Sequence, residues 1–142
     1  MGLVPAAPDQ DELVRAAAFR SELRRFLQRS DVVTADVGLT PQRYDLLLQL
    51  KASPTGHSTV TELGRLLHLR QTAVTELVKR AEEAGLVRRR RSESDRRVFL
   101  LELTEVGDQR VTRAFHALRR DRTAFADAFD TLGIHFRAAA PG

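Results

Sequence analysis

Basic residues are the one group of chemically active side chains that clusters in a single segment of this sequence. Ten Lys or Arg and only five Asp or Glu lie between residues 65 and 97, whereas the rest of the chain has 13 and 14. Four consecutive arginines, Arg88 to Arg91, form the densest part of this segment. A positive face of this kind binds phosphates and releases counterions from DNA. The alternative is that the four arginines only protect an edge strand from aggregation.

No group of residues has a spacing typical of catalysis. The sequence contains no Gly-rich phosphate loop and no Gly-x-Ser-x-Gly elbow. Its four histidines, His57, His68, His116 and His135, include no pair at i, i+3 or i, i+4 spacing, and there is no cysteine to complete a metal site. We therefore expect no enzymatic activity, no cofactor and no metal. The lack of cysteine also excludes sensing by thiol oxidation.

Length and composition favour a single folded domain. The chain has 142 residues, of which 42% are hydrophobic and 30% are charged. No basic N-terminal stretch precedes a long apolar run, and no apolar segment is long enough to cross a bilayer. We expect a flexible arm at residues 1–8, one domain at residues 9–142, a cytoplasmic location and no membrane partner.

The first part of the chain has the periodicity of helices. Apolar residues recur at helical spacing over residues 9–35, which predicts a first helix there. Thr40 can cap free backbone N–H groups and Pro41 fits a first helical turn, so a second helix is predicted to begin at this point and to continue to Lys51. Residues 52–58 are rich in turn formers and predict a loop.

The next segment has the pattern of a helix-turn-helix. Thr59 and Glu62 form a capping box for a short third helix that ends near Leu67. A fourth helix is predicted over residues 71–84, with Gly85 as the residue that ends it. Its buried stripe is predicted to consist of Val74, Leu77, Val78 and Ala81. Two short helices joined by a tight turn are typical of DNA-binding domains, although any small helical protein contains such pairs.

A β-hairpin is predicted directly after these helices. Apolar and β-branched residues indicate strands that start at Leu86 and Val98, with a turn at residues 92–95 between them. A hairpin in this position is called a wing. Thr104 then caps a fifth helix, and a sixth follows Asp121.

Six motifs in this order resemble the MarR family of winged helix-turn-helix regulators, over about residues 10–137. They are Leu39-Thr40-Pro41-Gln42, Thr61-Glu62-Leu63, Ala73-Val74-Thr75-Glu76-Leu77-Val78, Ala84-Gly85-Leu86-Val87, Asp95-Arg96-Arg97, and Leu103-Thr104 followed by Gly107. The resemblance implies a mainly α fold, namely a winged helix-turn-helix with a two-stranded β wing and terminal helices that form a dimerisation frame. The DNA-binding lobe would cover about residues 40–104, and the dimerisation helices residues 9–35 and 105–137.

The resemblance also implies a homodimer, and the phenylalanines agree with it. Six of the seven lie in the predicted dimerisation helices, at Phe19, Phe26, Phe115, Phe125, Phe129 and Phe136. Large aromatic side chains at both ends of a short chain need a surface to be buried against, which favours a dimer interface over an intramolecular core. A two-fold dimer predicts a pseudo-palindromic operator on double-stranded DNA.

The start of the fourth helix contains side chains that can reach base edges. Gln71 can pair with adenine, Arg70 with guanine, and Thr72 and Thr75 with a thymine methyl group or a phosphate. The alternative for the two threonines is helix capping or plain surface polarity. Lys79 is predicted to contact phosphates.

In the wing, the resemblance implies that Arg97 enters the minor groove and that Asp95 orients it by a charge-assisted hydrogen bond. The alternative for Asp95 is an ordinary turn residue. Arg96, Arg89 and Arg91 are predicted to attract the DNA backbone.

The family relationship finally implies a small-molecule effector that binds between the dimer frame and the DNA-binding lobes. Phe19, Tyr44, Leu48 and His116 are candidates for such a pocket, although each can equally be ordinary core or surface. The working hypothesis is a homodimeric repressor released by a ligand. The alternatives are a winged-helix module for protein contacts and a regulator without a ligand.

Overall fold

The structure, a computed structural model, describes residue 2 and residues 4–133. Within these residues the chain forms six helices and one three-stranded antiparallel sheet, so the predicted mainly α fold is confirmed. The chain divides into two compact units, residues 1–30 with 118–142, and residues 31–117. Phe136 and His135 lie outside the described residues. No helix in the described part of the chain is both long and apolar enough to span a membrane.

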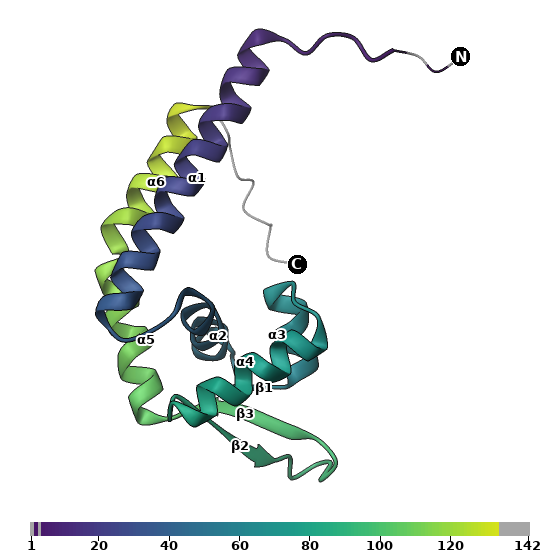
Figure 1. The fold of residues 1–142 in the computed structure, drawn as a ribbon, viewed down its shortest axis with the longest axis vertical. Coiled ribbons are helices and arrows are strands. Elements are labelled where there is room, and N and C mark those ends of the chain that lie inside the picture. Colours follow the sequence, from purple (N-terminus) through teal and green to yellow (C-terminus); the bar gives the residue numbers. More distant parts are fainter. Residues whose placement is uncertain (1, 3, 134–142) are drawn as a thin grey trace. The chain divides into compact units, whose positions relative to one another are not determined.

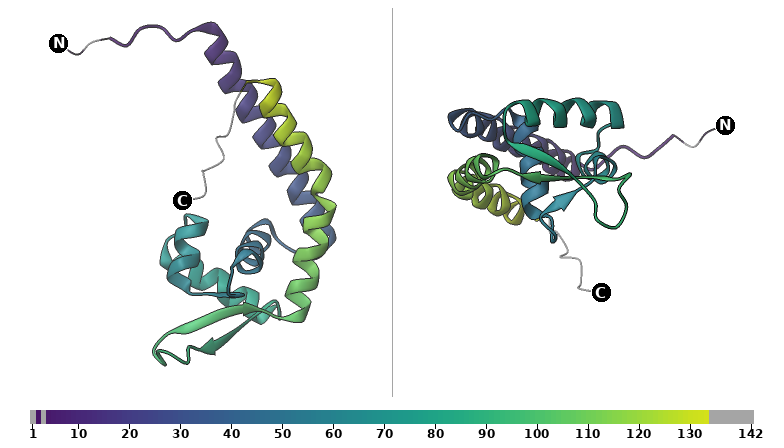
Figure 2. Two further views of the ribbon diagram at one scale, coloured as in Figure 1. Left: turned by 180° about the vertical axis from the view of Figure 1, so that it is seen from behind. Right: turned by 90° about the horizontal axis from the view of Figure 1, so that it is seen from below.

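The first unit is built on two helices that lie side by side (Figures 1 and 2). These are α1 (Gln10–Asp36), up to Ser30, and α6 (Arg119–Thr131). The backbone N–H of Asp9 donates to the Glu12 carboxylate at 3.4 Å, which is half of the capping box predicted for the start of α1. The two helices are also joined by an ion pair of 3.5 Å between Arg29 and Asp121.

Four phenylalanines pack between these helices within one chain. The ring centroids of Phe19 and Phe129 are 5.1 Å apart, those of Phe26 and Phe125 are 5.1 Å apart, and those of Phe125 and Phe129 are 4.5 Å apart. Phe129 is only 2% exposed. These four residues therefore pack as a core within the single chain, which is the alternative to the dimer interface that the sequence favoured. Phe115, in contrast, is 40% exposed.

The second unit contains the remaining elements: α2 (Pro41–Ala52), β1 (His57–Ser58), α3 (Val60–Leu67), α4 (Gln71–Glu83), β2 (Val87–Arg91), β3 (Phe99–Leu103) and α5 (Glu105–Ala117). Two of its helices begin as predicted, because the hydroxyl oxygen of Thr40 accepts from the Arg43 N–H and that of Thr59 from the Glu62 N–H, each at 3.2 Å. The core is aliphatic and includes Leu46, Leu47, Leu50, Leu63, Val74, Val78, Leu86, Leu101 and Val111.

The sheet has the order β1-β3-β2, with antiparallel pairing throughout. The register of the wing runs from Val87 opposite Leu103 to Arg91 opposite Phe99. The prediction of a plain loop over residues 52–58 was wrong at its end, because His57 and Ser58 form the short strand β1 on the free side of β3. The wing hairpin thus gains a third strand at its base.

Helix α5 is attached to the rest of the second unit by several contacts near its start. Near its start, the side chain of Asp108 forms an ion pair of 2.6 Å with Lys51 of α2. One turn earlier, the Thr104 hydroxyl donates to the carbonyl of Gly85 at 2.6 Å and accepts from the N–H of Gly107 at 3.1 Å. The predicted cap therefore also ties the beginning of α5 to the end of α4.

Candidate nucleic-acid interface

Helix α4 has one buried and one exposed face. The predicted stripe Val74, Leu77, Val78 and Ala81 is buried, as its spacing requires. The N-cap residue is Arg70, which has an extended backbone and makes no side-chain cap bond. Thr72 therefore lies inside the first turn and does not cap the helix.

The exposed face of α4 carries the predicted base-reading residues. Arg70, Gln71, Thr72, Thr75 and Lys79 are all exposed. The Thr75 hydroxyl donates to the backbone carbonyl of Gln71 at 2.8 Å, which fixes the hydroxyl while its lone pairs stay available as acceptors. The side chains at the start of α4 thus present both donors and acceptors to solvent.

The turn between α3 and α4 is tight because two residues allow it. His68 has a positive φ of 55°, and the N–H of Leu69 donates to the carbonyl of Gly64 at 3.0 Å. A β-carbon on residue 64 would stand 3.2 Å from the carbonyl oxygen of Leu69, so glycine allows this close approach. The turn sets the direction in which α4 leaves α3.

The tip of the wing holds the predicted pair of Asp95 and Arg97. Asp95 accepts from the backbone N–H of Arg97 at 3.0 Å, from its Nε at 3.2 Å and from its Nη2 at 3.4 Å. These hydrogen bonds, those of the side chain first, lower the pKa of Asp95. The side chain of Arg97 is nevertheless 91% exposed. The guanidinium is therefore oriented by the hairpin but remains open to a partner.

The four arginines of β2 alternate between the two faces of the wing. On one face, the Nε atoms of Arg88 and Arg90 donate to the two carboxylate oxygens of Glu102 at 2.8 and 3.2 Å. The bond from Arg88 is the main cause that lowers the pKa of Glu102, with a smaller contribution from Arg90. On the other face, Arg89 donates to Glu82 of α4 at 2.7 Å. The wing is thereby joined to α4.

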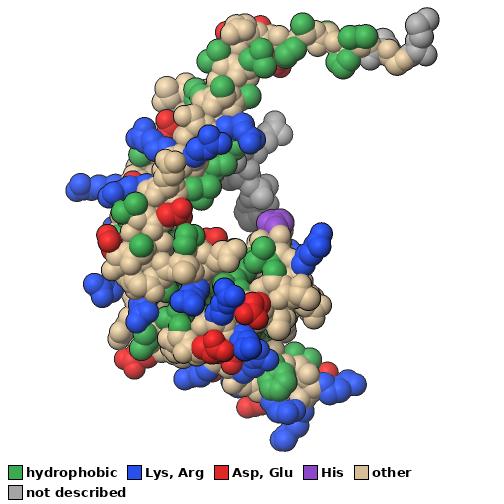
Figure 3. All heavy atoms as spheres, in the orientation of Figure 1, with side chains coloured by type: hydrophobic (Ala, Val, Ile, Leu, Met, Phe, Trp, Pro, Cys, Tyr) green, Lys and Arg blue, Asp and Glu red, His purple; other side chains and the backbone are tan. Residues whose placement is uncertain are grey.

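These ion pairs divide the cations of the basic segment into two groups. Six of the ten pair with a carboxylate of the same chain: Arg65, Arg80, Arg88, Arg89, Arg90 and Arg97. Within the described residues, Arg70, Lys79, Arg91 and Arg96 have no such partner. Figure 3 accordingly shows blue and red side chains interleaved where α4 and the wing lie. The positive field of this surface is weaker than the run of arginines suggests.

The predicted effector residues are not gathered around one described cavity. Phe19 lies in the first unit, and Tyr44, Leu48 and His116 lie in the second. Tyr44 is buried, Leu48 is half-buried and His116 is exposed. None of the four lines the cavity of about 500 Å³ that lies between α2, β1, α3 and β3.

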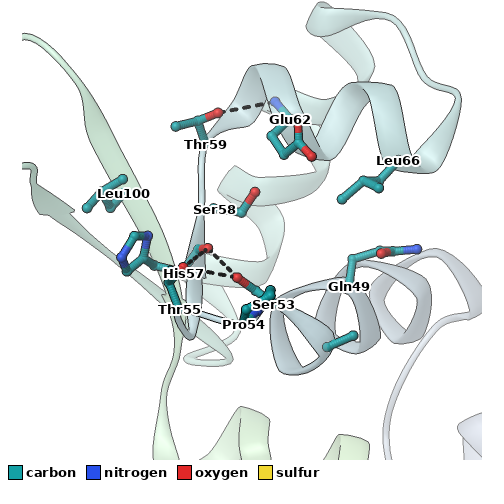
Figure 4. Close-up of a pocket in the computed structure, with 11 residues that line it drawn as sticks. Gln49, Ser53, Pro54, Thr55, His57, Ser58, Thr59, Glu62, Leu66 and Leu100 are labelled. Atoms are coloured by element: carbon teal, nitrogen blue, oxygen red, sulfur yellow. Dashed lines mark hydrogen bonds between the residues drawn. The ribbon is translucent and has the colours of Figure 1, made fainter. Parts of the chain in front are cut away.

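That cavity, drawn in Figure 4, has mixed polar and apolar walls. Its lining consists of Gln49, Ala52, Ser53, Pro54, Thr55, His57, Ser58, Thr59, Glu62, Leu66 and Leu100. The backbone carbonyl of His57 accepts from the hydroxyls of Ser53 at 2.7 Å and Thr55 at 3.2 Å (Figure 4). These bonds hold the loop before β1, so the cavity wall is well defined.

Sequence reasoning missed the carboxylates that neutralise the wing. The hairpin register places Glu102 opposite Arg88, because the connection between the strands runs from residue 92 to residue 98. The predicted turn at residues 92–95 would instead place Arg88 opposite Phe99, so it could not predict this pair. Glu82 had no signal in the sequence, because its contact with Arg89 depends on how α4 packs against β2. Phe99, whose ring lies near two arginines, was missed because the predicted turn does not place it opposite Arg91, as the observed register does.

Comparison with known proteins gives consistent results. The sequence model of the MarR family matches residues 37–98. A putative transcriptional regulatory protein for the hcr operon of Thauera aromatica is 29% identical over 130 residues, which are 86% of this chain and 77% of the relative. The organic hydroperoxide resistance transcriptional regulator of Bacillus subtilis is 39% identical over 71 residues, and this match spans only about half of either chain, 50% and 47%.

Among solved structures, a mutant of MarR from E. coli complexed with operator DNA has the same fold. Its TM-score is 0.69 at 18% identity, and the match covers 89% of this chain and 94% of that one. The likeness extends over both units of the chain.

Proposed function

Because the chain belongs to the MarR family of transcriptional regulators, we propose that it is a homodimeric repressor that binds a pseudo-palindromic operator and is released by a small-molecule ligand. One observation carries the DNA-binding part of this proposal. The exposed guanidinium of Arg97, held by Asp95, and the exposed start of α4 belong to the same compact unit. The wing with Arg97 suits the minor groove, and the start of α4 suits the major groove.

The residues divide by role. Arg70, Gln71, Thr72 and Thr75 would contact base edges, because they are exposed near the N-terminus of α4, the part of a recognition helix that reaches the bases. Lys79 and Arg96 would contact phosphates, since their charges are not cancelled by a carboxylate within the described residues. Arg89 and Arg91 would attract the DNA backbone to the same surface. Asp95 would orient Arg97.

The dimer would form through the first unit. Leu13, Val14 and Leu27 of α1 are each about half exposed in the single chain. The phenylalanine rings between α1 and α6 pack on one another and leave these three side chains uncovered. A second copy of the chain would cover them. Two lobes related by a two-fold axis then read half-sites about one helical turn apart, roughly 34 Å.

The effector would act by binding. The chain contains no cysteine, so a ligand cannot release it by oxidising a thiol. We keep Phe19, Tyr44, Leu48 and His116 as candidates for its contacts. A repressor of this kind has no catalytic role, and it acts in the cytoplasm, where the chromosome is.

Selection of bound fragments from a random pool of duplex DNA tests the proposal. We expect an enriched inverted repeat, and a logarithm of affinity that falls steeply with the logarithm of salt concentration. Recovery of no common sequence, together with an affinity that does not depend on salt, would refute DNA-binding regulation. A single half-site without an inverted copy would refute the dimeric mode alone.

A further inference from the structure

We propose that Phe99 is a positioning residue for DNA recognition: its ring holds Arg91, and through Arg91 it fixes the loop that carries Arg97 relative to α4. This inference rests on the proposed function, because it assigns a role in binding the operator. It concerns a side chain that the wing does not need for an apolar core, since Phe99 is 41% exposed.

The hairpin register brings the residues of this contact together. Arg91 and Phe99 stand directly opposite each other in the β2–β3 ladder, so their side chains share one face of the wing. The Arg91 guanidinium lies 5.0 Å from the centroid of the Phe99 ring, and that of Arg89 lies 5.9 Å from it. Both distances are within the range of a cation–π interaction.

Each of the two arginines makes a second contact, and the two contacts point in opposite directions along the wing. Arg89 donates to Glu82 of α4 at 2.7 Å. Arg91 donates through Nη1 to the backbone carbonyl of Arg96 at 2.8 Å. A continuous line of contacts therefore leads from α4 through Phe99 to the loop, where Arg97 follows Arg96 directly.

The aromatic ring holds Arg91 without cancelling its charge. On the opposite face, Arg88 and Arg90 are held by the Glu102 carboxylate, which neutralises one of the two charges. A ring attracts the cation through its quadrupole and adds no negative charge. This face of the wing thus keeps the Arg91 charge near the DNA while the loop is fixed, which lowers the entropy cost of docking Arg97.

Three variants test the inference, with the full chain and the operator obtained by selection. Phe99→Leu keeps an apolar side chain but removes the ring, whereas Phe99→Tyr keeps the ring. Arg90→Ala is the control, because Arg90 neighbours Arg91 on β2 and its side chain lies on the other face of the wing. The measurements are the Kd for the operator and for a random duplex as a function of salt. The NMR shifts of the Arg91 side-chain protons, which the ring current displaces in the unaltered protein, report the contact itself.

For Phe99→Leu we expect a roughly three- to tenfold weaker affinity for the operator, an unchanged affinity for random DNA and an unchanged salt slope, because no charge is lost. The displaced Arg91 shifts should disappear. Phe99→Tyr should restore the operator affinity to within about twofold. Arg90→Ala should weaken the binding of both duplexes by the same factor.

Two results would overturn the inference while leaving the proposed function intact. The first is a Phe99→Leu variant that loses the displaced shifts but binds the operator as tightly as the unaltered protein. The second is an equal loss for operator and random DNA, which would make Phe99 a general contact with the DNA backbone. Failure of the unaltered protein to bind any duplex would instead overturn the proposed function.

Discussion

The backbone of Gly107 lies so close to that of Leu86 that a β-carbon on residue 107 would overlap the Leu86 carbonyl oxygen. Leu86 is the last of the three residues between α4 and β2, and Gly107 lies in the first turn of α5. The same carbonyl of Leu86 accepts from the N–H of Thr104 at 3.0 Å. The segment that links α4 to the wing therefore packs directly against the start of α5.

Replacement of Gly107 by alanine should destabilise the second unit. The added methyl group meets backbone, which cannot move aside as a flexible side chain can, so we expect a loss of about 1–3 kcal/mol in the free energy of unfolding. Urea denaturation followed by circular dichroism measures this loss. Val106→Ala changes an exposed residue of the same turn and should have almost no effect. A Gly107→Ala variant as stable as the unaltered chain would contradict the close packing.

Removal of the Arg97 side chain should weaken operator binding by about 1–3 kcal/mol without affecting the fold, because the side chain is exposed. Asp95→Asn keeps an oxygen that can accept from the Arg97 backbone but weakens the hold on the guanidinium, so its effect should be smaller. Titration of a labelled operator measures both changes. Equal affinity of Arg97→Ala and the unaltered protein would remove Arg97 from the interface.

Substitution of Glu102 by glutamine should strengthen the binding of random DNA at low salt. The carboxylate holds both Arg88 and Arg90, and its loss leaves one more uncompensated positive charge on the wing. We expect a steeper dependence of the random-DNA affinity on salt, measured by fluorescence anisotropy. An unchanged slope would mean that this face of the wing points away from the DNA.

The same carboxylate predicts how the wing responds to acid. Hydrogen bonds from Arg88 and Arg90 hold the pKa of Glu102 in the folded chain below the ordinary glutamate value of 4.5. The stabilisation from these ion pairs is therefore present above pH 4.5 and is lost as the pH falls through the lowered value. In Glu102→Gln this part of the acid sensitivity should be absent, which acid titrations of the two proteins followed by circular dichroism can compare.

The proposed dimer should be disrupted by charges on the exposed side of α1 and not by changes in the aromatic cluster alone. We expect the double variant Leu13→Asp, Leu27→Asp to sediment as a folded monomer at micromolar concentration, because both side chains are about half exposed in the single chain. Sedimentation velocity and circular dichroism together make the measurement.

Phe129→Ala is the contrasting variant for this test. Its ring is buried between α1 and α6 of one chain, so its loss should lower helix stability before it changes the state of association. A persistent dimer in the double aspartate variant would place the interface elsewhere on the molecule.

The local features of the fold could be predicted from the sequence, and the long-range pairings could not. Thr40 and Thr59 cap their helices as predicted, because a cap depends on residues three positions apart. His57 and Ser58 were predicted to be a loop, since two residues show no alternation and their pairing depends on β3, far along the chain. The Arg89–Glu82 pair likewise required the packing of α4 on β2.

The aromatic cluster of the first unit has a consequence for the order of assembly. Phe19, Phe26, Phe125 and Phe129 find their partners within one chain. A newly made chain can therefore close this core before it meets a second copy, and the rate at which α1 and α6 come together should not depend on protein concentration. Association would then be a separate, second-order step between subunits that are already folded.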